Sequence, residues 1–168
     1  MLIFSIDPGY DRCGVAVLSR TAGVPDILYS SCITTDKKAP QSERLATIYK
    51  ELKTLISKWQ PEAIALETLF FSVNKKTAIK VAEARGVVLL LAGTAGMPLV
   101  ELSPQEVKLS MTGAGNASKE QVQKMVALTL RLDTSKKLDD EIDAIALGVA
   151  ALQHLAVENR LPPLAKKK

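Results

Sequence analysis

Residues 2–35, LIFSIDPGYDRCGVAVLSRTAGVPDILYSSCITT, decide the fold class of this chain. Three short runs rich in apolar and β-branched residues occur here, at 2–7, 13–20 and 26–35. Turn-forming residues separate the runs, with Asp7-Pro8-Gly9 after the first and Gly23-Val24-Pro25 after the second. Such short connections join neighbouring antiparallel strands. The stretch therefore predicts an antiparallel β-meander.

Helical and strand patterns alternate along the next part of the chain. Apolar residues recur at helical spacing over 41–60, and Pro61 ends this pattern. The apolar run at 63–67 does not alternate with polar residues, as expected of a central strand that is covered on both faces. A second helix is predicted over 76–95 and a further strand over 99–102.

The C-terminal part of the chain is predicted to be helical. Capping boxes at 103–106 (SPQE) and 118–121 (SKEQ) mark two helix starts. The last helix is predicted over 139–158, with one buried apolar stripe. The stripe consists of Ile142, Ile145, Val149 and Leu152. Residues 159–168 are expected to form a basic C-terminal tail.

This order of elements predicts an α/β protein, a mixed five-stranded sheet flanked by helices. The order resembles that of ribonuclease H-like folds. A length of 168 residues is close to the usual size of one domain, and neither a repeat nor an interdomain linker is evident in the sequence. We therefore expect residues 1–158 to form a single ribonuclease H-like domain.

The composition favours a protein that acts on an anion in the cytoplasm. The net charge is +4, which favours an anionic partner. Residues 1–6 lack a basic leader, and the uncharged stretch within 86–100 is shorter than the roughly 20 residues of a membrane span. Cys13 and Cys32 lack CxxC spacing, so we expect reduced thiols and not a disulfide or zinc site.

Two carboxylates follow predicted strands at the open end of the sheet. Asp7 ends the first strand and Glu67 ends the fourth, each after a run of apolar residues. Ligands of α/β sheets bind at such strand ends. Taken singly, Asp7 equally fits an Asp-Pro-Gly turn, and Glu67 equally fits a strand-end charge in solvent.

Two further carboxylates, Asp140 and Asp143, lie three residues apart on the last predicted helix and so share one side of it. Acidic residues in a first helical turn also complement the helix dipole, which is the alternative explanation. Like charges at this spacing repel each other, and hard cations such as Mg²⁺ relieve that repulsion. Two such ions can activate a water molecule and stabilise the leaving oxygen of a phosphodiester. The four carboxylates together predict a metal-dependent nuclease that cuts a DNA backbone.

Five motifs in the same order resemble those of the RuvC family of Holliday-junction resolvases. The resemblance covers nearly the whole chain. The matching segments are 3–9 (IFSIDPG), 66–71 (LETLFF), 84–87 (ARGV), the region 105–123 and 140–144 (DEIDA). Thr68 and the lysine-ended tail depart from the family pattern and leave the four carboxylates intact, which puts sequence preference in doubt and not the chemistry.

The resemblance implies a homodimer that resolves four-way DNA junctions by paired symmetric nicks. It also implies Mg²⁺ as the cofactor, two ions per active site, with Mn²⁺ able to substitute. The implied metal ligands are Asp7, Glu67, Asp140 and Asp143. Family membership further implies the RuvA and RuvB branch-migration proteins as partners.

The resemblance assigns roles to one aromatic residue and two lysines. Phe70 matches an aromatic that stacks on a base at the opened junction centre, the alternative being a core phenylalanine. Phe71 is expected to face the core. Lys108 and Lys119 match lysines that support catalysis by contacting DNA phosphate, the alternative being solvated helix lysines. Both lie beside the glycine-containing loop 113–115.

The second predicted helix carries two expected surfaces. Positive charge at Lys75, Lys76, Lys80 and Arg85 is consistent with a DNA-facing stripe and equally with an ordinary exposed face. The same helix is rich enough in apolar residues to pair with a second copy of the chain, although it could instead be the most buried helix of the monomer. The apolar residues are Ile79, Val81, Ala82, Val87, Val88, Leu90 and Leu91.

Three other functions remain open at this point. An ATP-binding protein of the actin and sugar-kinase type also begins with a strand-Asp-x-Gly hairpin, but it needs a second lobe for which this chain is too short. A DNA-structure-binding protein without catalysis would keep the fold and lose the carboxylates. A ribonuclease H-like nuclease that acts on RNA-DNA hybrids would share all four carboxylates.

Overall fold

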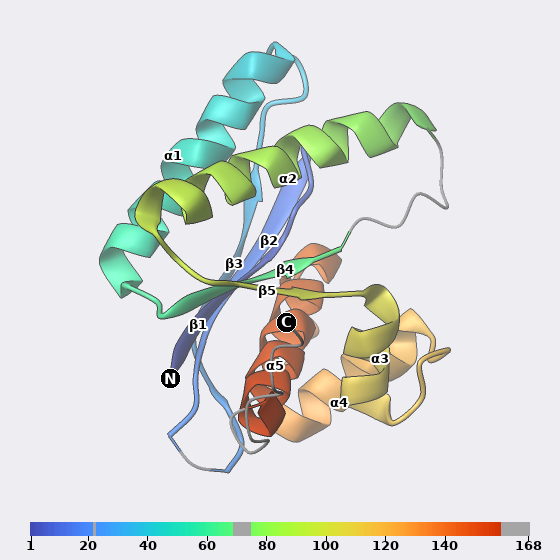
Figure 1. Ribbon diagram of the computed structural model, residues 1–168. Helices are drawn as coiled ribbons and strands as arrows, with labels where there is room; N and C mark the ends of the chain where they lie inside the picture. Colours follow the sequence, from blue (N-terminus) through green and yellow to red (C-terminus); the bar gives the residue numbers. More distant parts are fainter. Residues whose placement is uncertain (22, 69–74, 159–168) are drawn as a thin grey trace, which may run out of the picture.

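A computed structural model describes residues 1–21, 23–68 and 75–158 of the chain (Figure 1). Within these ranges five strands and five helices follow one another. The strands are β1 (Leu2–Asp7), β2 (Arg12–Ser19), β3 (Asp26–Thr34), β4 (Ala63–Glu67) and β5 (Leu99–Leu102). The helices are α1 (Gln41–Trp59), α2 (Lys75–Ala95), α3 (Pro104–Thr112), α4 (Lys119–Leu130) and α5 (Asp139–Glu158).

The strands form one mixed sheet in the order β3-β2-β1-β4-β5. The first three strands pair antiparallel, which confirms the predicted meander. Strand β4 then pairs in parallel with both β1 and β5. In this register Asp7 lies opposite Gly14 on β2, and Ile6 lies beside Leu66 on β4.

Helices cover both faces of the sheet (Figure 1). Because side chains alternate along a strand, Phe4 and Ile6 pack against α1 and α2, whereas Ile3 packs on the other side with α3, α4 and α5. The apolar run of β4 is buried along its length for the same reason. Among the described residues, no helix is both long enough and apolar enough to cross a membrane.

Helix α5 packs directly on the sheet and is the most enclosed of the helices (Figure 1). The four residues of its predicted apolar stripe are all buried. The prediction of a single stripe was too narrow, because every residue from Ala144 to Leu152 other than Gly148 is also part of the buried core. The helix lies between the sheet on one side and α3 and α4 on the other, so little of its middle reaches solvent.

Where both ends of an element were predicted, the observed bounds differ by at most one residue, and for α3 and α4 only the start was predicted. Helix α1 ends at Trp59 because Gln60 adopts the left-handed conformation and caps the helix. Both predicted capping boxes are present, at Ser103 and Ser118. Cys13 and Cys32 are both free thiols, as predicted.

A buried arginine on α1 supports the turn between β1 and β2. Arg44 is only 5 % exposed. Its guanidinium donates to the carbonyl of Tyr10 at 2.9 Å and to Oγ1 of Thr35 at 2.9 Å, and it forms an ion pair with Asp11. The ring of Tyr10 lies 5.0 Å from the guanidinium carbon. These contacts fix the turn that directly follows Asp7.

The first prediction concerns this arginine. Arg44→Met keeps the apolar stem of the side chain and removes the groups that satisfy the Tyr10 carbonyl and Asp11. We expect it to lower the free energy of unfolding by about 1–3 kcal/mol, the usual cost of leaving buried polar groups unpaired. Urea denaturation measures the change. Lys50→Met, on the exposed side of the same helix, is the control, and an equal effect in both variants would contradict a specific role for Arg44.

Candidate active site

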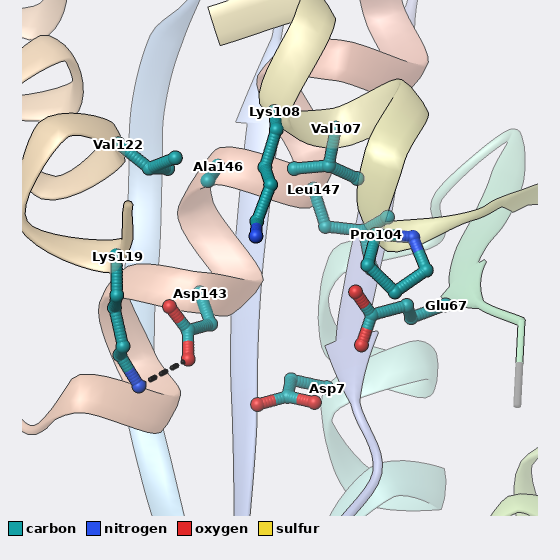
Figure 2. A pocket seen from close by; sticks show the side chains of 10 residues that line it. All are labelled: Asp7, Glu67, Pro104, Val107, Lys108, Lys119, Val122, Asp143, Ala146 and Leu147. Atoms are coloured by element: carbon teal, nitrogen blue, oxygen red, sulfur yellow. Dashed lines mark hydrogen bonds and ion pairs between the residues drawn. The ribbon is translucent and has the colours of Figure 1, made fainter. Parts of the chain in front are cut away.

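Three carboxylates from three separate elements face one pocket (Figure 2). Asp7 comes from the end of β1, Glu67 from the end of β4 and Asp143 from the first turns of α5. The pocket has a volume of about 270 Å³. Its lining is completed by Pro104, Val107, Lys108, Lys119, Val122, Ala146 and Leu147.

The sheet itself brings Asp7 and Glu67 together. Their strands are parallel neighbours, so both carboxylates leave the sheet at the same edge. Burial, followed by the negative charges of Glu67 and Asp143, raises the pKa of Asp7 to about 8. Burial and then the charge of Asp143 raise the pKa of Glu67 to about 7. The two carboxylates are therefore strained as anions where they stand.

The third carboxylate, Asp143, forms an ion pair with a lysine from another helix. Lys119 Nζ lies 2.8 Å from Asp143 Oδ2 and 3.6 Å from Asp139 Oδ2 (Figure 2). Burial raises the pKa of Asp143 and the bond from Lys119 partly opposes it. Burial lowers the pKa of Lys119, but the hydrogen bond to Asp143 and the negative charges of Asp143, Asp139 and Asp140 together outweigh burial, so the pKa is raised. Lys119 is thus a fixed cation at the pocket wall.

The fourth predicted ligand, Asp140, does not line the pocket with the other three. Its Oδ2 atom lies 2.8 Å from Nε of Arg12 at the start of β2. This contact is an ion pair without the geometry of a hydrogen bond, so among the described residues the buried Oδ2 receives no hydrogen bond. One carboxylate oxygen next to the pocket therefore lacks a hydrogen-bond donor.

Lys108 supplies a second cation to the pocket from above Glu67 (Figure 2). It lies on α3, whose first turn is fixed by the capping box between Ser103 and Glu106. The charge of Lys108 lowers the pKa of Glu67, in opposition to burial. Both lysines predicted to act in catalysis are thus among the residues that line the pocket.

The donor set fits a hard divalent cation. All the acidic groups offer oxygen, which Mg²⁺ and Ca²⁺ prefer. Within the part of the chain that the structure describes, no three acidic, thiol or imidazole groups are yet close enough to share one ion. Asp143 and Asp140 are instead ion-paired with Lys119 and Arg12, and the raised pKa of Asp7 together with the unsatisfied Asp140 oxygen indicates that a cation would stabilise these carboxylates as anions.

The predicted DNA-facing residues of the second helix have different surroundings. Phe70 and Phe71 lie outside the described residues, as do the side chains of Lys75 and Lys76. Lys80 is exposed and lies 5.0 Å from the ring centre of Tyr10. Arg85 is an ion-pair partner of Glu101 and donates to the main-chain carbonyl of Glu67 at 3.4 Å. It therefore supports the end of β4.

Sequence reasoning missed two arginines near this site. Arg12 balances Asp140, and Arg44 holds the turn after Asp7. The role of Arg44 could have been recognised from the sequence, because this residue shares the buried side of α1 with Ile48 and Leu52, and a charge on an apolar stripe is unusual. The role of Arg12 could not, because its partner Asp140 is distant in the sequence.

Known proteins are similar to this chain in both sequence and fold. Residues 3–151 match the family described as crossover junction endodeoxyribonuclease RuvC. The RuvC protein of Thermosipho melanesiensis is 44 % identical over 160 residues, which are 95 % of this chain and 99 % of that one. That of Moorella thermoacetica is 45 % identical over 149 residues, 89 % of each chain.

Solved structures show the same relationship. The structure of Thermus thermophilus RuvC in complex with a Holliday junction substrate has a TM-score of 0.86 and 30 % identity, and covers 98 % of this chain and 99 % of that one. The yeast mitochondrial Holliday junction resolvase Ydc2 has a TM-score of 0.63 at 17 % identity, covering 94 % of this chain and 82 % of its own, which is a likeness of fold alone.

The fold and the pocket together define a nuclease of the ribonuclease H-like class, as predicted. Within this class the chain belongs to the RuvC family, the crossover junction endodeoxyribonucleases. It is therefore a phosphodiester hydrolase of DNA, and nucleases of this family are metal-dependent. The ATP-binding alternative is excluded by this membership.

The second prediction follows from the pKa of Asp7. A carboxyl group whose pKa rises from 3.8 to about 8 on folding stabilises the native state fully below pH 3.8, and this contribution is lost as the pH rises toward 8. The Asp7→Asn variant cannot ionise at this position, so it does not lose this stability as the pH rises. In metal-free buffer at pH 8 we expect its Tm to exceed that of the wild type by at least about 2–4 °C, the shift that 1 kcal/mol gives a domain of this size.

Thermal denaturation from pH 4 to pH 8 checks this expectation. The stability of the wild type should fall across this range more steeply than that of Asp7→Asn, because only the wild type must ionise Asp7. Asp26→Asn, at the exposed start of β3, is the control and should keep the wild-type pH profile. Identical profiles for wild type and Asp7→Asn would show that Asp7 is not under electrostatic strain.

Proposed function

We propose that this chain resolves Holliday junctions by paired symmetric nicks, at a carboxylate site that holds two Mg²⁺ ions. The observation that carries the proposal is the convergence of Asp7, Glu67 and Asp143 from three separate elements on one pocket between two lysines. The substrate class follows from membership of the RuvC family and from the likeness to an RuvC structure that contains a junction.

Each carboxylate has a position suited to ligation. Asp7 lies between Glu67 and α5, so Asp7, Glu67 and Asp143 would hold the ions together (Figure 2). Asp140 would be the fourth ligand, in place of its ion pair with Arg12. When bound, the ions supply an activated water and stabilise the leaving oxygen of the phosphodiester. Mn²⁺ meets the same oxygen-donor requirement and can substitute.

The two lysines hold the substrate phosphate. Lys108 and Lys119 flank the carboxylates, so their ammonium groups lie where a negatively charged backbone must approach an acidic pocket. Lys119 is ion-paired with Asp143, and a cation that neutralised this carboxylate would leave the charge of Lys119 available to the phosphate. Each lysine offsets part of the repulsion between DNA and the carboxylates.

A homodimer is required by the substrate. Paired nicks at symmetry-related positions need two active sites, and the described residues contain one such pocket. The exposed side of α2 is the proposed interface. Ile79 and Leu90 are 64 % and 59 % exposed on this side, and a Cβ atom at Gly86 or Gly93 would meet nothing within 4 Å. Val88 and Leu91 are buried within the chain, so the predicted dimer surface is narrower than the sequence indicated.

Further features of the proposal rest on the family resemblance or on the sequence pattern. By the resemblance Phe70 stacks on a base at the junction centre, and by the sequence pattern Lys75, Lys76, Lys80 and Arg85 add positive charge that faces DNA. Residues 1–158 form the nuclease domain and 159–168 a basic tail. The protein acts in the cytoplasm with RuvA and RuvB.

A competition experiment tests the proposed substrate. A labelled four-way junction is cut in the presence of increasing amounts of unlabelled junction, RNA-DNA hybrid or linear duplex. We expect the unlabelled junction to inhibit strongly and the hybrid to inhibit no better than duplex DNA. Preferential cutting of the hybrid would favour the ribonuclease alternative, whereas binding without any cutting in Mg²⁺ would favour the non-catalytic one.

The third prediction tests the ligands one at a time. Asp7→Asn, Glu67→Gln, Asp140→Asn and Asp143→Asn each remove a ligand charge without changing shape, so each should slow cleavage by at least about 100-fold, the upper cost of losing an outer metal-site contact. Junction binding in EDTA should persist. Asp139→Asn, an exposed acid in the same helical turn as Asp140, is the control and should cleave within a few-fold of the wild type. A variant with the wild-type rate would remove that residue from the site.

The fourth prediction tests the dimer. Leu90→Glu places a charge on the exposed apolar side of α2, so light scattering should detect monomers whose circular dichroism spectrum matches that of the wild type. Leu128→Glu makes the same change at an equally exposed position of α4 and should leave the dimer intact. Dimers that carry one Asp7→Asn subunit should nick one strand only. A monomer that makes both cuts in one binding event would overturn the proposed assembly.

A further inference from the structure

One residue lies against both halves of the proposed metal site and has no side chain. Gly14 on β2 is the cross-strand partner of Asp7 on β1. On the face that bears α5, it lies directly beneath the first turn of that helix, which carries Asp140 and leads to Asp143. The glycine therefore lies next to the strand that carries Asp7 and against the main chain of the helical turn that carries Asp140.

The helix approaches the strand so closely that only glycine fits. A Cβ atom at Gly14 would lie 1.8 Å from the carbonyl oxygen of Asp140, 2.4 Å from its carbonyl carbon and 3.2 Å from the amide nitrogen of Glu141. All three are main-chain atoms, so a rotamer change cannot relieve the overlap. Any side chain at position 14 has to displace the first turn of α5 from the sheet.

A second contact holds the same turn against the sheet from the β3 side. Ser30 donates a hydrogen bond to Glu141 Oε1 at 2.6 Å, and Lys137 Nζ lies 2.6 Å from the same oxygen and 3.0 Å from Ser30 Oγ. Gly14 permits the close approach, and Ser30 and Lys137 retain it. These contacts together hold the start of α5 close against β1 and β2.

We propose that Gly14 is a positioning residue for metal binding, because its contact with Asp140 sets the distance between the helix carboxylates and Asp7. This inference rests on the proposed metal site. Shared ligation requires carboxylates from β1, β4 and α5 to reach the same ions, and a displacement of about 1 Å in an active site can cost about 100-fold in rate. A side chain at position 14 moves two ligands at once while leaving all four carboxylates in the sequence.

Gly148 provides a matched control on the same helix. A Cβ atom there would lie 2.3 Å from Leu18 Cδ1 and 2.7 Å from Ser5 Oγ, so this glycine also allows α5 to approach the sheet closely. Its neighbours, however, are side-chain atoms in the core and not part of the pocket. Gly148→Ala therefore disturbs packing, whereas Gly14→Ala disturbs packing and ligand position together.

The test measures binding of Mn²⁺ alone by calorimetry, with Tm and junction binding in EDTA measured on the same samples. We expect Gly14→Ala to bind Mn²⁺ at least about tenfold more weakly than the wild type, with junction affinity in EDTA changed by less than about threefold. Gly148→Ala should lower Tm and keep wild-type Mn²⁺ affinity. Unchanged Mn²⁺ affinity in Gly14→Ala, or an equal loss in both glycine variants, would overturn the proposal.

Two further variants test the proposal if Gly14→Ala does not fold and separate it from the proposed function. If Gly14→Ala does not fold, Ser30→Ala removes the second contact without changing charge and should weaken Mn²⁺ binding several-fold, and no change would overturn the proposal. Asp7→Asn separates this inference from the proposed function. If the Asp7→Asn variant binds Mn²⁺ as tightly as the wild type does, the proposed metal site is wrong. If Mn²⁺ affinity falls in Asp7→Asn but not in Gly14→Ala, only the proposed role of Gly14 is refuted.

Discussion

The parallel pairing of β1 with β4 is the constraint on which the site depends. It turns two strands that are distant in sequence into neighbours that end at the same edge, and so places Asp7 beside Glu67. The apolar residues before each carboxylate supply the burial that fixes the strands, and the same burial raises the pKa of both acids. The packing that builds the pocket also creates the electrostatic strain that a cation relieves.

The basic residues around the pocket fall into two groups, those that contact a proposed metal ligand and those that contact the main chain beside one. Arg12 balances Asp140 and Lys119 balances Asp143, while Arg44 and Arg85 hold the main chain next to Asp7 and Glu67. The first two contacts involve carboxylates that the proposed metal site would use. The other two arginines bind main-chain carbonyls beside the pocket, and their side-chain partners lie outside the four carboxylates. The chain thus separates the support of the site from the neutralisation of its charge.

Much of this could be predicted from sequence, because local patterns determine it. The strand and helix periods and the turn at Asp7-Pro8-Gly9 predicted eight elements to within one residue at each end, and the capping boxes predicted where α3 and α4 begin. The partners of individual charges could not be predicted. The pairing of Arg12 with Asp140 depends on where α5 crosses β2, and the enclosure of α5 depends on α3 and α4 packing over it. Such contacts arise from tertiary packing and do not produce a repeating pattern of residues in the sequence.

The place of α5 at the C-terminal end of the described fold has a consequence for synthesis. Its contacts reach every strand of the sheet, so it can dock only after those strands have paired. A nascent chain that has reached β5 already carries Asp7 and Glu67 but lacks the residues that complete the pocket. On the ribosome, where domains form as the chain emerges, catalytic competence is the last property to appear. An unfinished chain therefore carries two of the three carboxylates that face the pocket but lacks Asp143 and both pocket lysines.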